Sequence, residues 1–312
     1  MGIARFIQMD VFTEEPFAGN PLAVFPEAQE ISDELMLKIA REMNLSETVF
    51  VLPARNDQTL RRLRIFTPVR EIPFAGHPVV GTWNALAREG IVLPPKTGAG
   101  WIRIHHEVGI GNLPVDIEFK GEQVVQVVMT QGKFEILDEI EDGQEQAEIA
   151  RALGRDREDL DETLPIQTIS TGLPSLAVPI RSLADLRNCR INAALLSELY
   201  NRHDATACYA FTRETIEVGE ARAHARLFAP DYNIPEDPAT GSAAGALGAY
   251  LVHHGATGVD AVDGTYRFVI EQGDFIQRPS RIRLEVKGKL NAVEEVRVGG
   301  PSVVVARGEV IL

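Results

Sequence analysis

Two stretches of the chain are apolar on nearly every face of a helix, and most other apolar residues fall in short strand-like runs. Residues 243–252 read AAGALGAYLV, and residues 79–87 read VVGTWNALA. A helix without a polar face is buried on all sides. Because strand-like segments surround both stretches, the simplest packing wraps a curved sheet around each helix. The pattern therefore predicts two similar modules, each built on a central helix.

Capping residues indicate where several helices begin and end. Ser32 is a candidate N-cap for a helix that ends near Met43, because acidic residues follow it in the first turn. Pro78 suits the first position of the first central helix, which we expect to end at Gly90. The other expected helices span about 242–253, 143–153 (inside the acidic stretch 133–165) and 192–203.

Strand-like runs complete an α+β pattern with two pseudo-symmetric modules. We expect the first module at 1–126, with a returning strand at 302–312, and the second at 127–301. A chain of 312 residues suits about two domains. The expected strands are 4–12, 21–25, 47–52, 61–66, several within 101–130, 166–170, 175–180, 206–212, 221–229, 265–272, 281–287 and 302–311.

Composition narrows the class of protein. A net charge of −14 argues against a nucleic-acid surface or an anionic membrane surface as partner. The N-terminal residues lack the apolar core of a signal peptide, and no window approaches the roughly 18 apolar residues of a membrane span. Cys189 and Cys208 do not make a disulfide framework, and Cys208, which lies in a strand-like run, is expected to be a buried structural thiol. We therefore expect a cytoplasmic protein.

Three glycine-bearing motifs are candidates for chemistry. FAGNP (17–21) is expected to be a turn between strands, whereas FAGHP (74–78) and DPATGS (237–242) each lead into a central helix. Free backbone N–H groups at a helix start can hold an anion. The last two motifs therefore predict a small-molecule site.

Each candidate residue also has a structural interpretation. Gly76 lets the backbone approach a ligand closely, and His77 titrates near neutral pH, but a tight turn with a buried histidine fits as well. Asp237 begins a turn and Ser242 suits an N-cap. GSAAG is not the nucleophile elbow of serine hydrolases, which has serine at the centre of G-x-S-x-G.

Glu47 begins an apolar strand and is the candidate acid/base. If its side chain faces the interior, desolvation would suit the carboxyl to proton transfer near neutral pH. A solvent-facing residue at a strand end is the alternative.

Four segments together resemble the PhzF family of phenazine-biosynthesis-like isomerases: MDVFTEEPFAGNPLAVF, NLSETVFV, TPVREIPFAGHPVVGT and DPATGSAAGALGAYL. The resemblance implies the diaminopimelate epimerase-like fold, with two modules that each roll a sheet round a central helix. It also implies a homodimer that needs no metal and no organic cofactor. The best-known family reaction isomerises a dihydro-hydroxyanthranilate.

The same resemblance assigns roles to the candidate residues. It implies that Glu47 removes a proton from one carbon of a small amino- or hydroxycarboxylate and returns it to another. His77 and Asp237 would orient and polarise this substrate in a cleft between the modules. The residues expected to bind its carboxylate are Gly76, Gly241 and Ser242.

Cysteine-based racemases of the wider superfamily differ at two positions. Their motifs MCGHG and SPCGTG, set beside FAGHP and DPATGS, place the catalytic cysteines at Ala75 and Ala239. Alanine cannot exchange a proton, so the two-cysteine mechanism is excluded. A racemase or epimerase with a non-cysteine base and a non-catalytic ligand-binding protein remain the alternatives.

Overall fold

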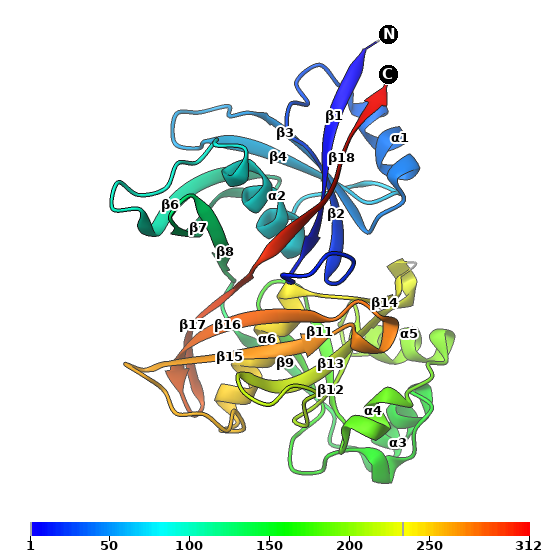
Figure 1. Ribbon diagram of the computed structural model, residues 1–312. Helices are drawn as coiled ribbons and strands as arrows, with labels where there is room; N and C mark the ends of the chain where they lie inside the picture. The colour runs from blue at the N-terminus through cyan, green and yellow to red at the C-terminus, as the bar shows by residue number, and fades with distance from the viewer. Residues whose placement is uncertain (1, 233) are drawn as a thin grey trace. The chain divides into compact units, whose positions relative to one another are not determined.

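The computed structural model describes residues 2–232 and 234–312, which separate into two compact units (Figure 1). The N-terminal unit comprises Met1–Thr130 and Gly299–Leu312, and the C-terminal unit comprises Gln131–Val298. Among the described helices, none is long and apolar enough to cross a membrane.

In the N-terminal unit, strands surround one buried helix. The strands pair in the order β18, β1, β2, β3, β4, β6, β7, β8, and α2 contacts β1, β2, β3, β8 and β18. The elements are β1 (Ile3–Val11), β2 (Asn20–Phe25), α1 (Asp33–Met43), β3 (Glu47–Pro53), β4 (Arg61–Phe66), β5 (Glu71–Ile72), α2 (Gly76–Arg88), β6 (Ala99–Val108), β7 (Gly111–Lys120), β8 (Gln123–Thr130) and β18 (Ser302–Ile311).

The C-terminal unit repeats this plan around α6. Its strands pair in the order β9, β10, β11, β12, β13, β15, β16, and α6 contacts β10, β15 and β16. The elements are β9 (Glu135–Glu139), α3 (Gly143–Ala152), η1 (Arg157–Asp159), β10 (Gln167–Ser170), β11 (Ser175–Pro179), α4 (Leu183–Arg187), α5 (Ala193–Arg202), β12 (Cys208–Thr212), β13 (Ala221–Ala229), η2 (Pro230–Tyr232), β14 (Ile234–Asp237), α6 (Gly241–His253), β15 (Thr265–Gln272), η3 (Asp274–Ile276), β16 (Ser280–Lys289) and β17 (Ala292–Gly300).

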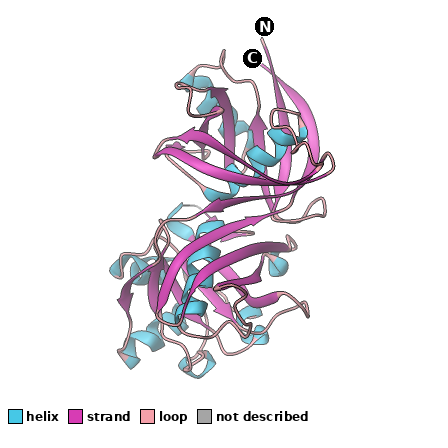
Figure 2. Ribbon diagram, turned by 90° about the vertical axis from the view of Figure 1, so that its left-hand side faces the viewer, coloured by secondary structure: helices cyan, strands magenta, loops and turns pink. Residues whose placement is uncertain are grey.

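The two units share one order of parallel and antiparallel pairs. The pairs β2–β3 and β4–β6 are parallel, as are β11–β12 and β13–β15, and the intervening pairs are antiparallel in both units. The central helix follows a short strand in each unit, β5 or β14, and has 13 residues in each. Figure 2 shows strands enclosing helices within each unit. The expectation of two similar modules is confirmed at the level of topology.

Small residues let the sheets approach the central helices closely. A Cβ atom on Gly81 of α2 would lie 2.6 Å from side-chain atoms of Leu22 and Val11, and one on Gly248 of α6 would lie 2.4 Å from Leu284. Residues 77–87 and 243–252 are all buried, as their apolar patterns predict.

Most expected elements are present, with differences at their ends. Pro78 occupies the third position of α2, not the first, because the helix already begins at Gly76; proline is tolerated there since N–H groups of the first turn lack helical acceptors. The first three residues of FAGNP lie in the turn between β1 and β2, and its last two, Asn20 and Pro21, begin β2; Gly19 adopts φ +64° beside the Val11 carbonyl. The described elements that the pattern did not predict are β5, β9, α4, β14, β17 and the short 3₁₀ helices η1, η2 and η3.

Candidate active site

Glu47 and His77 lie together in the N-terminal unit. Glu47 is the first residue of β3, in register with Leu22 on the parallel strand β2, and His77 is the second residue of α2. The His77 Nε2 atom lies 3.4 Å from Glu47 Oε2, and the two side chains are 8% and 13% exposed. Glu47 is therefore not a solvent-facing residue at a strand end.

His77 is held in its neutral form. Burial lowers the pKa of His77 to about 3, because desolvation disfavours the charged imidazolium. At neutral pH the Glu47–His77 contact therefore joins a carboxyl group to a neutral imidazole. A neutral imidazole offers one N–H donor and one acceptor nitrogen.

The central helices differ from the others in how they begin. The N-caps of α2 and α6 are Ala75 and Thr240; among the described residues, neither makes a side-chain capping hydrogen bond, and neither helix has an acidic residue in its first turn. Side chains do cap the other α-helices, and these caps are Ser32, Asp142, Ser182 and Asn192. The first turns of α2 and α6 are thus suited to a bound anion.

Asp237, Gly241 and Ser242 lie together at the start of α6. Asp237 ends β14 and is buried, and its Oδ2 accepts a hydrogen bond from the Thr240 hydroxyl. Gly241 and Ser242 are the first two residues of α6, and the Ser242 carbonyl accepts a bond from the Thr171 hydroxyl at 3.3 Å. The candidate residues thus form two groups, one in each unit, with Gly76 beside His77 in the first.

Positions 75 and 239 carry methyl groups where superfamily racemases have thiols. Ala75 is the N-cap of α2, and Ala239 immediately precedes the N-cap of α6. Both cysteines are buried elsewhere. Burial raises the pKa of Cys189 to about 11 and raises the pKa of Cys208 further. Neither thiol is suited to act as a base at neutral pH.

The sequence did not reveal the role of two residues near Asp237. Thr240 lies within DPATGS, but its hydroxyl had no assigned partner. Gln272 ends β15, 32 residues beyond Thr240, and its side chain bonds to both Asp237 and Thr240. No local motif marks Gln272, and only the folding of β15 beside β13 could reveal it.

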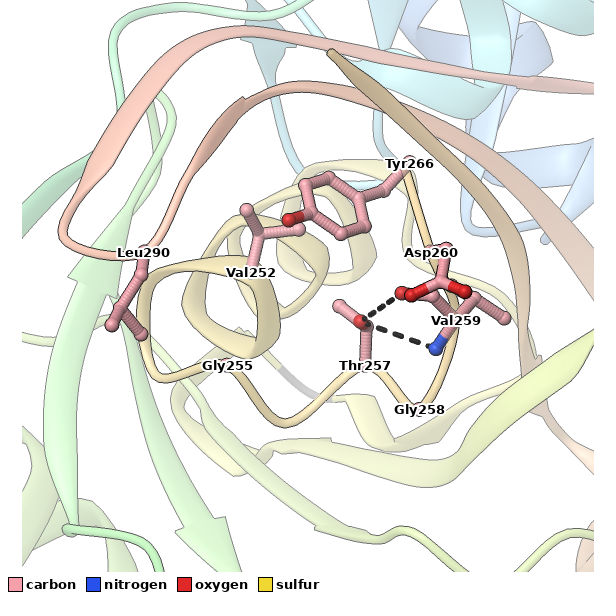
Figure 3. A pocket seen from close by; sticks show the side chains of 8 residues that line it. All are labelled: Val252, Gly255, Thr257, Gly258, Val259, Asp260, Tyr266 and Leu290. Carbon is pink, nitrogen blue, oxygen red and sulfur yellow. Dashed lines mark hydrogen bonds between the residues drawn. The ribbon is translucent and has the colours of Figure 1, made fainter. Parts of the chain in front are cut away.

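Two surface cavities of the C-terminal unit lie away from these groups. A cavity of about 310 Å³ adjoins the C-terminal end of α6, between Tyr266 and Leu290, and a bond from the Thr257 hydroxyl to the Val259 carbonyl shapes its loop (Figure 3). A second, of about 470 Å³, lies beside α3 and η1 and includes Arg157 and Asp161. None of the candidate residues lines either cavity.

A sheet wrapped around a central helix in each unit is the architecture of the diaminopimelate epimerase-like class. A family model described as "Phenazine biosynthesis-like protein" matches residues 9–308, and the chain belongs to this PhzF family. The resemblance found in the sequence is thereby confirmed.

Named relatives match along almost the whole chain. A protein of Clostridium acetobutylicum named as an uncharacterized isomerase is 37% identical, covering 98% of this chain and 97% of the relative. The trans-2,3-dihydro-3-hydroxyanthranilate isomerase of Pseudomonas aeruginosa is 34% identical, covering 99% of each. The crystal structure of a PhzF-family protein from Bacillus anthracis matches with a TM-score of 0.85 at 27% identity, covering 100% of each chain. The chain is therefore an isomerase of this family.

Proposed function

We propose that this isomerase moves a proton within a small amino- or hydroxycarboxylate, with Glu47 as the acid/base. The observation that carries the proposal is the contact between a largely buried carboxyl group and a buried, neutral imidazole beside a helix start that no side chain caps. A carboxyl at such a place can accept and return a proton while water is largely kept away.

The proposed reaction is balanced within one substrate molecule. Glu47, as a carboxylate, accepts a proton from one carbon and becomes a carboxylic acid, while the electron pair left behind is delocalised into the substrate. The carboxylic acid then returns the proton to a second carbon, and Glu47 is again a carboxylate. Neutral His77 donates a hydrogen bond to charge that develops on the substrate, without adding a proton of its own.

The remaining candidates would be substrate-binding residues of their own units. Backbone N–H groups at Gly76 in α2, and at Gly241 and Ser242 in α6, would each be suited to a substrate carboxylate, as helix starts hold anions. Asp237 would accept a hydrogen bond from an amino or hydroxyl group. The chemistry requires no metal and no organic cofactor. We also propose, from the family resemblance, a homodimer, which light scattering after gel filtration would test.

The test is proton NMR in D₂O with trans-2,3-dihydro-3-hydroxyanthranilate, the substrate named for the Pseudomonas relative, and a panel of related amino- and hydroxycarboxylates. Glu47→Gln should lower turnover by roughly 10²–10⁴-fold, the usual contribution of a general acid/base. Glu107→Gln is the matched control, because its carboxylate is also 13% exposed in the same unit but contacts Arg55 and Arg62. Unchanged turnover in Glu47→Gln would show that the assigned role is wrong.

Chiral analysis of the product separates this reaction from its alternative. A positional isomerase moves the proton between two carbons, whereas an epimerase returns it to the opposite face of the same carbon. A product with unchanged connectivity and inverted configuration would favour an epimerase that uses Glu47 as a base. Binding without turnover across the panel would favour a non-catalytic protein.

A further inference from the structure

Gln272 is a fully buried side chain whose hydrogen-bonding capacity is used completely. Its Nε2 donates to the Asp237 carbonyl at 2.8 Å and to the Thr240 hydroxyl at 3.1 Å. Its Oε1 accepts from the Tyr209 hydroxyl at 2.9 Å and from the Thr240 backbone N–H at 3.2 Å. These four bonds match the two donors and two acceptor sites of an amide.

The backbone fixes which way the Gln272 amide points. A carbonyl can only accept, so the Asp237 carbonyl must face Nε2; a backbone N–H can only donate, so that of Thr240 must face Oε1. Burial raises the pKa of Tyr209 well above its usual value, so its hydroxyl keeps the proton that it donates. The opposite orientation of the amide would break both bonds to the backbone, to the Asp237 carbonyl and from the Thr240 N–H.

This orientation gives the Thr240 hydroxyl a direction. Because the hydroxyl accepts from Gln272 Nε2, its own proton is available for the Asp237 carboxylate, to which it donates. A threonine at an N-cap ordinarily accepts a bond from the first turn of its helix. Thr240 makes no such bond among the described residues.

Neighbouring residues hold the same turn in place. The Ser280 hydroxyl donates to the Pro238 carbonyl at 2.9 Å. Gly273 adopts φ +84°, and a Cβ atom there would lie 2.6 Å from the Pro238 carbonyl oxygen. The turn 237–240 is therefore fitted closely against the end of β15.

We propose that Gln272 is a positioning residue: it holds the Thr240 hydroxyl on the Asp237 carboxylate and away from the first turn of α6. In this way one buried amide orients Asp237 and also keeps α6 without a side-chain cap. Its effect on catalysis rests on the function proposed above, whereas its effect on Thr240 does not.

The first test is structural and needs no substrate. In Gln272→Met, which keeps the length of the side chain but loses its polar atoms, the Thr240 hydroxyl should rotate and cap α6. Hydrogen exchange at the backbone amides of residues 242 and 243 should slow by roughly threefold or more, and a crystal structure should show the new bond. An unchanged hydroxyl with unchanged exchange would overturn the proposal.

The second test is kinetic and uses the turnover assay. Gln272→Met should lower kcat by roughly 10- to 100-fold, the range expected when a reacting group is misplaced by about 1 Å, and should change KM less. Thr240→Val should lower kcat similarly, and Thr240→Ser, which keeps the hydroxyl, should restore it. Gln167→Met is the matched control, since Gln167 is a buried glutamine that bonds to His254 at the other end of α6.

The outcomes separate the two proposals. If Glu47→Gln is inactive while Gln272→Met and Thr240→Val keep the wild-type kcat, the positioning role is wrong and the proposed function stands. If Glu47→Gln retains full activity, the proposed function fails, and the exchange measurement still decides the role of Gln272. Should Gln272→Met not fold, Tyr209→Phe removes one anchor of the amide, and an unaltered kcat together with unaltered exchange in that variant would overturn the proposal.

Discussion

The two units share a topology but differ in the chemistry at the start of the central helix. Beside α2, a carboxyl group meets a neutral imidazole, Glu47 against His77. At α6, a hydrogen-bonded network of Asp237, Thr240 and Gln272 holds a turn. The repeated architecture supplies two buried helices whose described N-caps make no side-chain hydrogen bond, and the function proposed above places proton transfer in one unit.

The strand register identifies the equivalent residues at which the two units differ. Glu47 stands opposite Leu22 at the start of the β2–β3 pair, and Cys208 stands opposite Leu176 at the start of the equivalent β11–β12 pair. Cys208 is fully buried, and burial raises the pKa of its thiol. The position that carries a carboxyl group in one unit thus carries a buried thiol with a raised pKa in the other.

The largest expected effect is a loss of turnover, and substitutions at these two equivalent positions should differ in it. Glu47→Gln should lower turnover by roughly 10²–10⁴-fold, because it removes the proposed acid/base. Cys208→Ala should leave kcat and KM unchanged and reduce only stability. Turnover by NMR and urea denaturation measure the two effects. A large loss of kcat in a folded Cys208→Ala protein would contradict the assignment of proton transfer to the N-terminal unit.

A smaller effect concerns acid stability. The pKa of His77 is about 3 in the folded protein and about 6.5 in the unfolded chain, so the unfolded chain binds more protons between these values. This depressed pKa makes the folded state lose stability as pH falls from about 6.5 towards 3. Between pH 7 and 5 the contribution lost is about 2 kcal/mol.

Urea denaturation at pH 7 and pH 5 checks this expectation. His77→Asn should lose about 2 kcal/mol less than the wild-type protein between the two pH values, whatever its stability at pH 7. Equal losses in wild type and His77→Asn would show that His77 is not the group responsible.

The next effect tests the missing cap of α2. Ala75 has an extended backbone, with φ −155° and ψ 144°, that suits a serine N-cap. Ala75→Ser should raise stability by about 1 kcal/mol, since its hydroxyl can accept a bond from the first turn. The same hydroxyl competes with the substrate carboxylate and should raise KM by roughly tenfold, equivalent to about 1.4 kcal/mol of binding.

Ser32→Ala at α1 is the matched control. It removes a cap that the structure shows and should lower stability by about 1 kcal/mol without changing KM. If Ala75→Ser stabilises the protein and leaves KM unaltered, the first turn of α2 does not bind the substrate.

Burial pattern explains how much of the fold the sequence could predict. The central helices were predictable because every face is apolar, and most strands because they are buried runs. β9 escaped because EILDE is mostly exposed and acidic, and α4 because five residues carry little periodicity. β17 alternates weakly, with exposed glutamates at its start.

The candidate site was predictable only in part. Glu47 and His77 are far apart in sequence. Their contact depends on the parallel register of β2 and β3, which no local sequence pattern predicts. The family resemblance supplied that link. Gln272 has no motif, so its bonds to the turn 237–240 required the fold itself.

The smallest expected effect is that of thiol reagents on turnover. A racemase with a cysteine at each helix start would be inactivated by alkylation, whereas this chain has Ala75 and Ala239 there and buries Cys189 and Cys208. Because burial raises the pKa of both thiols, little thiolate exists at pH 7.5 to react. Iodoacetamide should therefore leave kcat unchanged, with mass spectrometry showing no adduct until urea unfolds the protein. Rapid inactivation that follows alkylation of either cysteine would show that a thiol takes part in the reaction. The proposed difference between the two units, with proton transfer at Glu47 and none at Cys208, would then be wrong.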